Sequence, residues 1–167
     1  MFFFFFENCQ NEEDAAVLEK SGFSRITVLP LTRLKVGNVK ITRIPAQHGT
    51  YKNCGEAMGV MFSAETEKTF YLAGDTVWYY GVQKAINEFK PEVIALNCCA
   101  AETKENGRLI MGAEDVWNVS LTAPEVNILL CAIFSVKKKV FLCAEPAIHS
   151  GKDSQLCGEE IFLFSQS

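Results

Sequence analysis

The chain has 167 residues, of which 49% are hydrophobic and 22% are charged, and its formal net charge at pH 7 is −4. This composition excludes a largely disordered chain, a collagen-like repeat and a disulfide-stabilised miniprotein, and the length suits one domain with a substantial core. A mildly acidic protein lacks the basic surface that grips phosphate backbones, so we expect no nucleic-acid partner.

The predicted elements, in chain order, begin with a helix that Asn11 caps and Gly22 ends. Strands are predicted over 25–29, 36–44, 57–64 and 69–73, with a hairpin turn at 65–68. A helix over 80–90, a strand over 93–96, a helix over 113–119 and a strand over 128–134 follow. Strands grouped first and then alternating with helices indicate a layered α/β domain. We expect one domain over 1–167.

The seven cysteines show no paired C-x-x-C spacing, which argues against a disulfide framework and against a four-cysteine zinc site. Free thiols in a reducing compartment are the simplest interpretation, so we expect a cytoplasmic protein. No apolar run reaches the roughly 18 residues of a membrane span, and we expect no membrane partner. The run Phe2–Phe6 lacks the basic region of a signal peptide; a buried aromatic strand and a start created by truncation of a longer chain are both open.

Two residues at predicted strand ends suit a metal site. His48 follows one strand and Asp75 follows another, in Ala73-Gly74-Asp75-Thr76, and we expect the two strands to lie side by side. Each residue alone is more simply a surface or turn residue. Together they are ligands suited to zinc or manganese, and a carboxylate can bridge two metal ions.

Three further side chains are weaker candidates. Cys98 and Cys99 follow the strand over 93–96 and could add a thiol or backbone groups to the same rim, although buried small residues are the simpler interpretation. His149 lies in the irregular stretch after Glu125, where a solvent-exposed histidine is favoured.

Several blocks, in this order and spacing, resemble the metallo-β-lactamase fold hydrolases, and within them the bacterial branch that includes the ascorbate-6-phosphate lactonase-like proteins. The blocks are Ala46-Gln47-His48-Gly49, Gly59-Val60, Tyr71-Leu72-Ala73-Gly74-Asp75-Thr76, Lys90-Pro91-Glu92-Val93-Ile94-Ala95-Leu96-Asn97 and Ile110-Met111-Gly112-Ala113-Glu114-Asp115-Val116. The resemblance covers about 10–125, and 126–167 is a divergent tail. It implies an αββα sandwich of which this chain supplies the second half.

The resemblance also implies a metal-dependent hydrolase that attacks an ester, lactone or phosphoester of a small molecule with metal-bound hydroxide. His48 matches a later histidine of the family's metal site and Asp75 matches its bridging aspartate. The family's first motif, His-x-His-x-Asp-His, is missing, because no histidine precedes His48. Cys98, Cys99, His149 or another chain would then supply further ligands to zinc or manganese.

The sequence is also compatible with two other functions. The chain could be a non-catalytic remnant or an interaction protein that forms a homo-oligomer to cover an exposed sheet face, since one sheet of the sandwich would lack its partner. A thiol-reactive protein that uses Cys98 or Cys99 is the third interpretation.

Overall fold

The computed structural model describes residues 7–29, 33–52, 54–136 and 139–147. In chain order its elements are β1 (Glu7–Cys9), α1 (Glu12–Lys20), β2 (Ile26–Val28), β3 (Arg33–Val36), β4 (Val39–Ala46), β5 (Ala57–Ala64), β6 (Glu67–Leu72), α2 (Tyr80–Phe89), β7 (Val93–Asn97), β8 (Glu102–Thr103), β9 (Gly107–Arg108), α3 (Ala113–Thr122), β10 (Asn127–Val136) and β11 (Lys139–Ala147). None of the helices in these ranges is long and apolar enough to cross a membrane.

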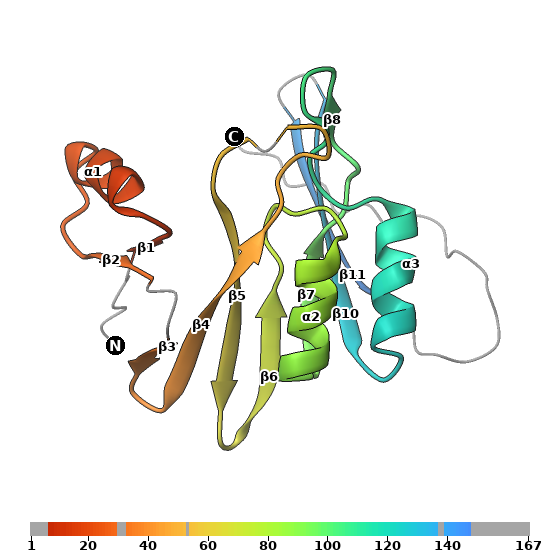
Figure 1. Ribbon diagram of the computed structural model, residues 1–167, viewed down its shortest axis with the longest axis horizontal. Coiled ribbons are helices and arrows are strands. Elements are labelled where there is room, and N and C mark those ends of the chain that lie inside the picture. Colours follow the sequence, from red (N-terminus) through yellow and green to blue (C-terminus); the bar gives the residue numbers. More distant parts are fainter. Residues whose placement is uncertain (1–6, 30–32, 53, 137–138, 148–167) are drawn as a thin grey trace.

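The main sheet has seven strands in the order β11-β10-β7-β6-β5-β4-β3 (Figure 1). Strands β3 to β6 pair as an antiparallel meander, whereas β7 pairs in parallel with both β6 and β10. Parallel neighbours need a crossover connection, and α2 and α3 provide the two crossovers. The predicted change from grouped strands to alternating strands and helices is therefore confirmed.

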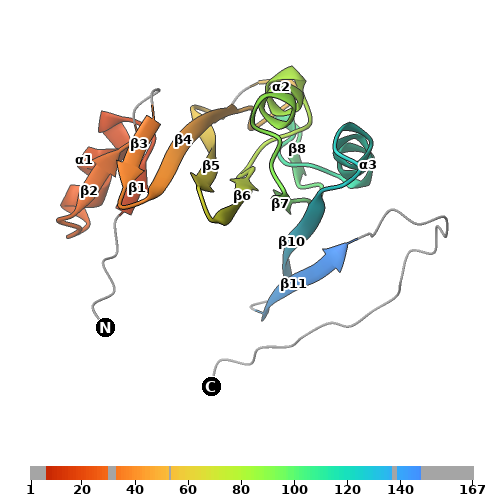
Figure 2. The ribbon, with the colours of Figure 1, turned by 90° about the horizontal axis from the view of Figure 1, so that it is seen from below.

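Both crossover helices lie on one face of this sheet (Figure 2). The core lies between them and the strands, and its fully buried side chains include Met61 of β5, Leu96 of β7 and Val119 of α3. Burial of each such side chain stabilises the fold by about 2 kcal/mol. The clear helical spacing of Val82 and Ile86 in the sequence correctly predicted the buried stripe of α2.

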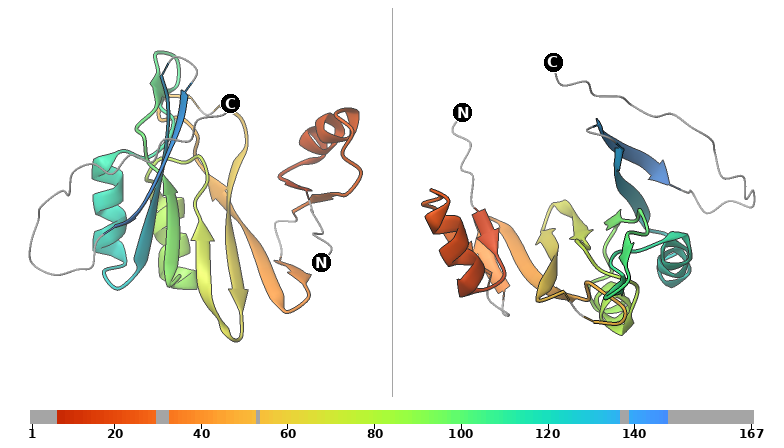
Figure 3. Two further views of the ribbon diagram at one scale, coloured as in Figure 1. Left: turned by 180° about the vertical axis from the view of Figure 1, so that it is seen from behind. Right: turned by 90° about the horizontal axis from the view of Figure 1, so that it is seen from above.

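The opposite face of the sheet is also apolar. Because alternate residues of a strand point to opposite faces, the neighbours of the core residues form a second row. On this row Phe62 stacks on Phe70 with ring centroids 5.9 Å apart, and Leu72 and Leu129 are 38% and 39% exposed. The left view of Figure 3 shows the molecule from behind, with no helix in front of β5 and β6. The structure is thus one helix-covered sheet, as expected for one half of an αββα sandwich.

The N-terminal unit consists of α1 and the parallel pair β1–β2. Asn11 caps α1 as predicted, since its side chain accepts the backbone N–H of Asp14 at 2.8 Å. Arg43 of β4 joins the unit to the main sheet. It donates to the Gln10 carbonyl at 2.6 Å and forms an ion pair with Glu56 at 3.3 Å.

The predicted strand over 36–44 is wrong at its start. The chain turns at Gly37 and Asn38, so that Val36 ends β3 and pairs with Val39 of β4. A Gly-Asn pair between two strand patterns is a hairpin signal that the prediction missed. The irregular stretch after Glu125 contributes more than was predicted, because β10 and β11 extend the main sheet through Ala147.

Candidate metal centre

The C-terminal ends of β4, β6 and β7 lie at one edge of the main sheet, because these three strands run in the same direction. His48 follows the end of β4, Asp75 follows the end of β6 and Asn97 is the last residue of β7. The expectation that the strands before His48 and Asp75 lie side by side is wrong, since β5 lies between them. Because β5 is antiparallel to both β4 and β6, these two strands run in the same direction. Their C-terminal ends therefore lie at the same edge of the sheet.

Hydrogen bonds join the two loops across the end of β5. The backbone N–H of Gln47 donates to the Thr76 hydroxyl at 3.0 Å, and the backbone N–H of Val77 donates to the Gln47 carbonyl at 2.9 Å. Thr76 is fully buried, and its hydroxyl donates to the Val77 carbonyl at 2.9 Å. Since Gln47 precedes His48 and Thr76 follows Asp75, these bonds hold the two candidate ligands in neighbouring loops.

A tyrosine adds a third hydrogen bond, between β4 and the segment that follows Asp75. The Tyr79 hydroxyl donates to the Pro45 carbonyl at 2.6 Å. Burial raises the pKa of Tyr79 above its ordinary value, and the pKa of Tyr71 is raised further by its burial in the core and then by the proximity of Tyr79. Both phenols therefore remain protonated at neutral pH, and of the two only Tyr79 has a hydrogen-bond partner within the described residues.

The half-buried His48 ring is held by the Leu109 carbonyl, which lies 3.0 Å from Nδ1. A carbonyl oxygen only accepts, so we assign the proton of the neutral ring to Nδ1. The lone pair is then on Nε2, which is the form in which a histidine binds a metal ion while its other nitrogen is held by an oriented acceptor.

The Asp75 carboxylate is exposed and is oriented by one neighbour. Its Oδ1 accepts the side-chain amide of Asn97 at 2.7 Å, and this bond leaves Oδ2 available to a cation. Gly74 shapes the backbone before it, because its φ is +68° and a Cβ at this position would lie 2.5 Å from the Met58 carbonyl oxygen. Only glycine meets both conditions without strain.

The remaining sequence candidates do not complete a ligand set within the described ranges. The Cys98 thiol donates to the Cys131 carbonyl at 3.9 Å, Cys99 is half-buried, and His149 lies outside the described residues. Among the residues that the structure describes, no three histidine, cysteine, aspartate or glutamate side chains gather as a metal site. His48 and Asp75 thus have the chemistry of two ligands, whereas a catalytic zinc ion takes about three from the protein.

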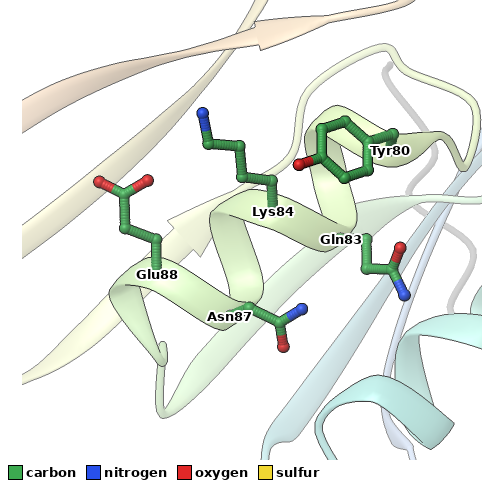
Figure 4. Close-up of a pocket in the computed structure, with 5 residues that line it drawn as sticks. All are labelled: Tyr80, Gln83, Lys84, Asn87 and Glu88. Atoms are coloured by element: carbon green, nitrogen blue, oxygen red, sulfur yellow. The ribbon is translucent and has the colours of Figure 1, made fainter.

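Two surface hollows differ in their relation to these ligands. The one in Figure 4 has a volume of about 340 Å³ and is lined by five residues of α2 alone, among them Tyr80, Lys84 and Glu88. The other, of about 430 Å³, lies between the loop after His48 and the β8–β9 hairpin; Tyr51 and Arg108 are among its lining residues. Only the second adjoins the segment that holds His48.

The sequence did not predict several residues that organise this edge. Thr76 and Gln47 stand beside the two predicted ligands in the sequence and were given no role of their own, and no partner was predicted for the amide of Asn97. The signal for Asn97 was available, since it is a polar residue at the end of a buried apolar strand. The Leu109 carbonyl carried no signal, because a backbone group has no identity in the sequence and the contact spans 61 positions.

Known proteins resemble this chain over most of its length. The UPF0173 protein YddR of Bacillus subtilis (strain 168) is 34% identical over 124 residues, which are 72% of this chain and 48% of YddR. An isothiocyanate hydrolase from Delia radicum gut bacteria matches with 35% identity and a TM-score of 0.69, over 74% of this chain and 51% of its own. A possible metal-dependent hydrolase from Veillonella parvula DSM 2008 matches with 32% identity, the same TM-score, and 74% and 50% coverage. No protein-family model matches the chain.

A more distant structure identifies the fold. The metallo-β-lactamase fold protein YhfI from Bacillus subtilis has a TM-score of 0.55 at 13% identity, over 75% of this chain and 52% of YhfI. The chain spans about half the length of the relatives that it matches. Over the matched residues it therefore has the metallo-β-lactamase fold, as about half of such a domain, and it is related in sequence to an isothiocyanate hydrolase and to a possible metal-dependent hydrolase.

Proposed function

We propose that the chain supplies His48 and Asp75 as two protein ligands to the metal centre of a hydrolase that acts on a small molecule. The observation that carries this proposal is the pair of hydrogen bonds between the Gln47 backbone and the Thr76–Val77 segment, one to the Thr76 hydroxyl and one from the Val77 N–H, which holds the two ligand loops together. The Nδ1 contact of His48 and the Asn97 contact of Asp75 support it, because each leaves one ligand atom available.

Zinc or manganese is the metal that this ligand pair suits. When bound, such an ion activates water as a nucleophile at neutral pH. His48 would hold it through Nε2 and Asp75 through its carboxylate, while Asn97 and the Leu109 carbonyl orient these two side chains. The remaining ligands would come from outside the described residues: His149, another chain, or a longer protein that contains this one.

The substrates to test are esters, lactones and phosphoesters. The relative named an isothiocyanate hydrolase adds isothiocyanates to this panel. We further propose that the protein is cytoplasmic, because its seven cysteines show no paired C-x-x-C spacing and free thiols suit a reducing compartment.

The test measures metal and activity together. Purified full-length chain is freed of metal and dialysed against Zn²⁺ or Mn²⁺, bound metal is measured by plasma emission, and hydrolysis of the panel is followed. We expect bound metal to fall in His48→Gln and in Asp75→Asn but not in Glu65→Gln, an exposed carboxylate at the β5–β6 turn, at the other end of the sheet. Equal metal content in all four proteins, or none in the wild type, would refute the proposal.

A second candidate function rests on the apolar outer face of the sheet, where Leu72 and Leu129 are well exposed. A non-catalytic protein that forms a homo-oligomer through this face would need no complete metal site. Sedimentation distinguishes the two: a stable oligomer without metal or hydrolysis supports the second function, and a metal-binding monomer supports the first.

A further inference from the structure

We propose that Thr50 is a positioning residue that holds His48 in its metal-binding tautomer. This inference rests on the proposed function, but it concerns the metal-free protein. Thr50 lies two residues after His48, and its hydroxyl accepts the backbone N–H of Arg108 at 2.9 Å. Arg108 precedes Leu109, whose carbonyl holds Nδ1 of His48 at 3.0 Å.

These contacts close a short cycle of chain and hydrogen bonds. It runs from His48 to Thr50 along the chain, across to Arg108, on to Leu109 and back to the imidazole. The Asn106 carbonyl strengthens it, because it accepts the backbone N–H groups of both Thr50 and Tyr51 at 2.9 Å each. The position of the Leu109 carbonyl relative to the ring is therefore fixed by the loop that carries the ring itself.

The backbone N–H of Leu109 is also hydrogen-bonded. It donates to the Ala101 carbonyl at 2.8 Å, next to the paired strands β8 and β9. The carbonyl that faces His48 is thus anchored from both directions, and a ring nitrogen that meets a fixed acceptor carries the proton. A freely exposed neutral imidazole exchanges its proton between the two nitrogens.

Gly107 is independent evidence that the approach of Thr50 is close. Its φ is +71°, and a Cβ there would lie 2.2 Å from the Thr50 hydroxyl oxygen. A side chain at this position would push the hydroxyl away from the Arg108 N–H. Glycine, the smallest residue, therefore stands where Thr50 approaches the backbone.

The test reads the His48 tautomer directly. The chain has only two histidines, so a His48→Gln variant assigns their ¹⁵N signals in the metal-free protein. At a fixed pH where the ring is neutral, we expect Nδ1–H in the wild type and in Thr50→Ser, which keeps the hydroxyl. In Thr50→Val, which keeps the shape and loses the acceptor, we expect a mixture of both tautomers.

Zinc affinity is the second measurement. A lost outer-shell contact weakens metal binding by roughly 10- to 100-fold, so we expect about a tenfold rise in Kd for Thr50→Val and little change for Thr50→Ser. An Nε2–H ring in the wild type, or a pure Nδ1–H ring in Thr50→Val, would overturn the inference, and the first result stands even if Thr50→Val does not fold. A tautomer change in a protein that binds no zinc would support the positioning role while the proposed function fails.

Discussion

The backbone N–H of Gln47 donates to the hydroxyl of Thr76 at 3.0 Å. The two residues follow β4 and β6, and the bond passes the end of β5, the strand between them. Thr76 is fully buried, so water cannot replace its hydroxyl as the acceptor of this bond. Together with the bond from the Val77 N–H to the Gln47 carbonyl at 2.9 Å, it links the loop of His48 to the loop of Asp75.

Thr76→Val should therefore destabilise the protein. The substitution keeps the shape and leaves the Gln47 N–H without its acceptor, which costs about 1–3 kcal/mol of unfolding free energy. Urea denaturation measures the loss, and Thr76→Ser, which retains the hydroxyl, should recover most of it. A Thr76→Val protein as stable as the wild type would show that the loops are held together by other contacts.

Gly74→Ala should be more costly than an alanine at another left-handed glycine. Gly74 has a φ of +68° and no room for a Cβ beside Met58, whereas Gly37 has a φ of +61° and nothing within 4 Å. Both variants incur about 1–2 kcal/mol of backbone strain, and only Gly74→Ala adds a clash. Thermal unfolding of both variants should rank Gly74→Ala as the less stable; the opposite order would contradict the close approach.

Asn97→Ala should weaken zinc binding by about tenfold without unfolding the chain, because it removes the amide that orients the Asp75 carboxylate. Asn127→Ala is the matched control, since Asn127 begins β10 at the other end of the sheet. Zinc titration by calorimetry compares the two. Equal affinity in both variants would show that Asp75 needs no such orientation.

Tyr71→Phe should leave the protein as stable as the wild type or stabilise it by about 1 kcal/mol. The Tyr71 hydroxyl is buried and has no hydrogen-bond partner in the described part of the chain. Removing it ends a desolvation penalty and leaves a small void. Urea denaturation near pH 7 measures the difference, and a loss of more than about 2 kcal/mol would indicate a hidden partner.

The same tyrosine predicts a loss of stability in alkali. Its pKa is raised by burial in the native state, whereas an unfolded tyrosine titrates near pH 10. Above that pH the unfolded state binds fewer protons, so the contribution of such a tyrosine to stability is unchanged below about pH 10 and then falls by up to about 1.4 kcal/mol per pH unit. Tyr71→Phe should show a shallower decline from pH 10 to 11 than the wild type, and burial of Tyr79 and Cys9, which raises the pKa of both groups, contributes to the decline that remains.

The elements of the fold were largely predictable, because strand and helix periods are local. The strand over 57–64 was predicted with its observed bounds, and α2 ends within one residue of the prediction. The order of strands was not local information, and this is why β5 was not placed between the strands of His48 and Asp75.

The candidate site was predictable in its two side chains and not in what holds them. His48 and Asp75 were recognisable as ligand types at strand ends. The Leu109 carbonyl and the Gln47 N–H are backbone groups, identical in every residue, and their partners are 61 and 29 positions away. The reach of Thr50 to Arg108 spans 58 positions and likewise depends on the folded chain.

The stacked Phe62–Phe70 pair shares the outer side of the sheet with Leu72 and Leu129, and this has a practical consequence for handling the protein. Partly exposed apolar surface associates more strongly in sulfate or phosphate and less strongly in mild urea. Light scattering should therefore rise with ammonium sulfate at concentrations where the Leu72→Lys variant stays clear. Preparations made in phosphate buffers would then differ in colloidal behaviour from those made in low-salt amine buffers.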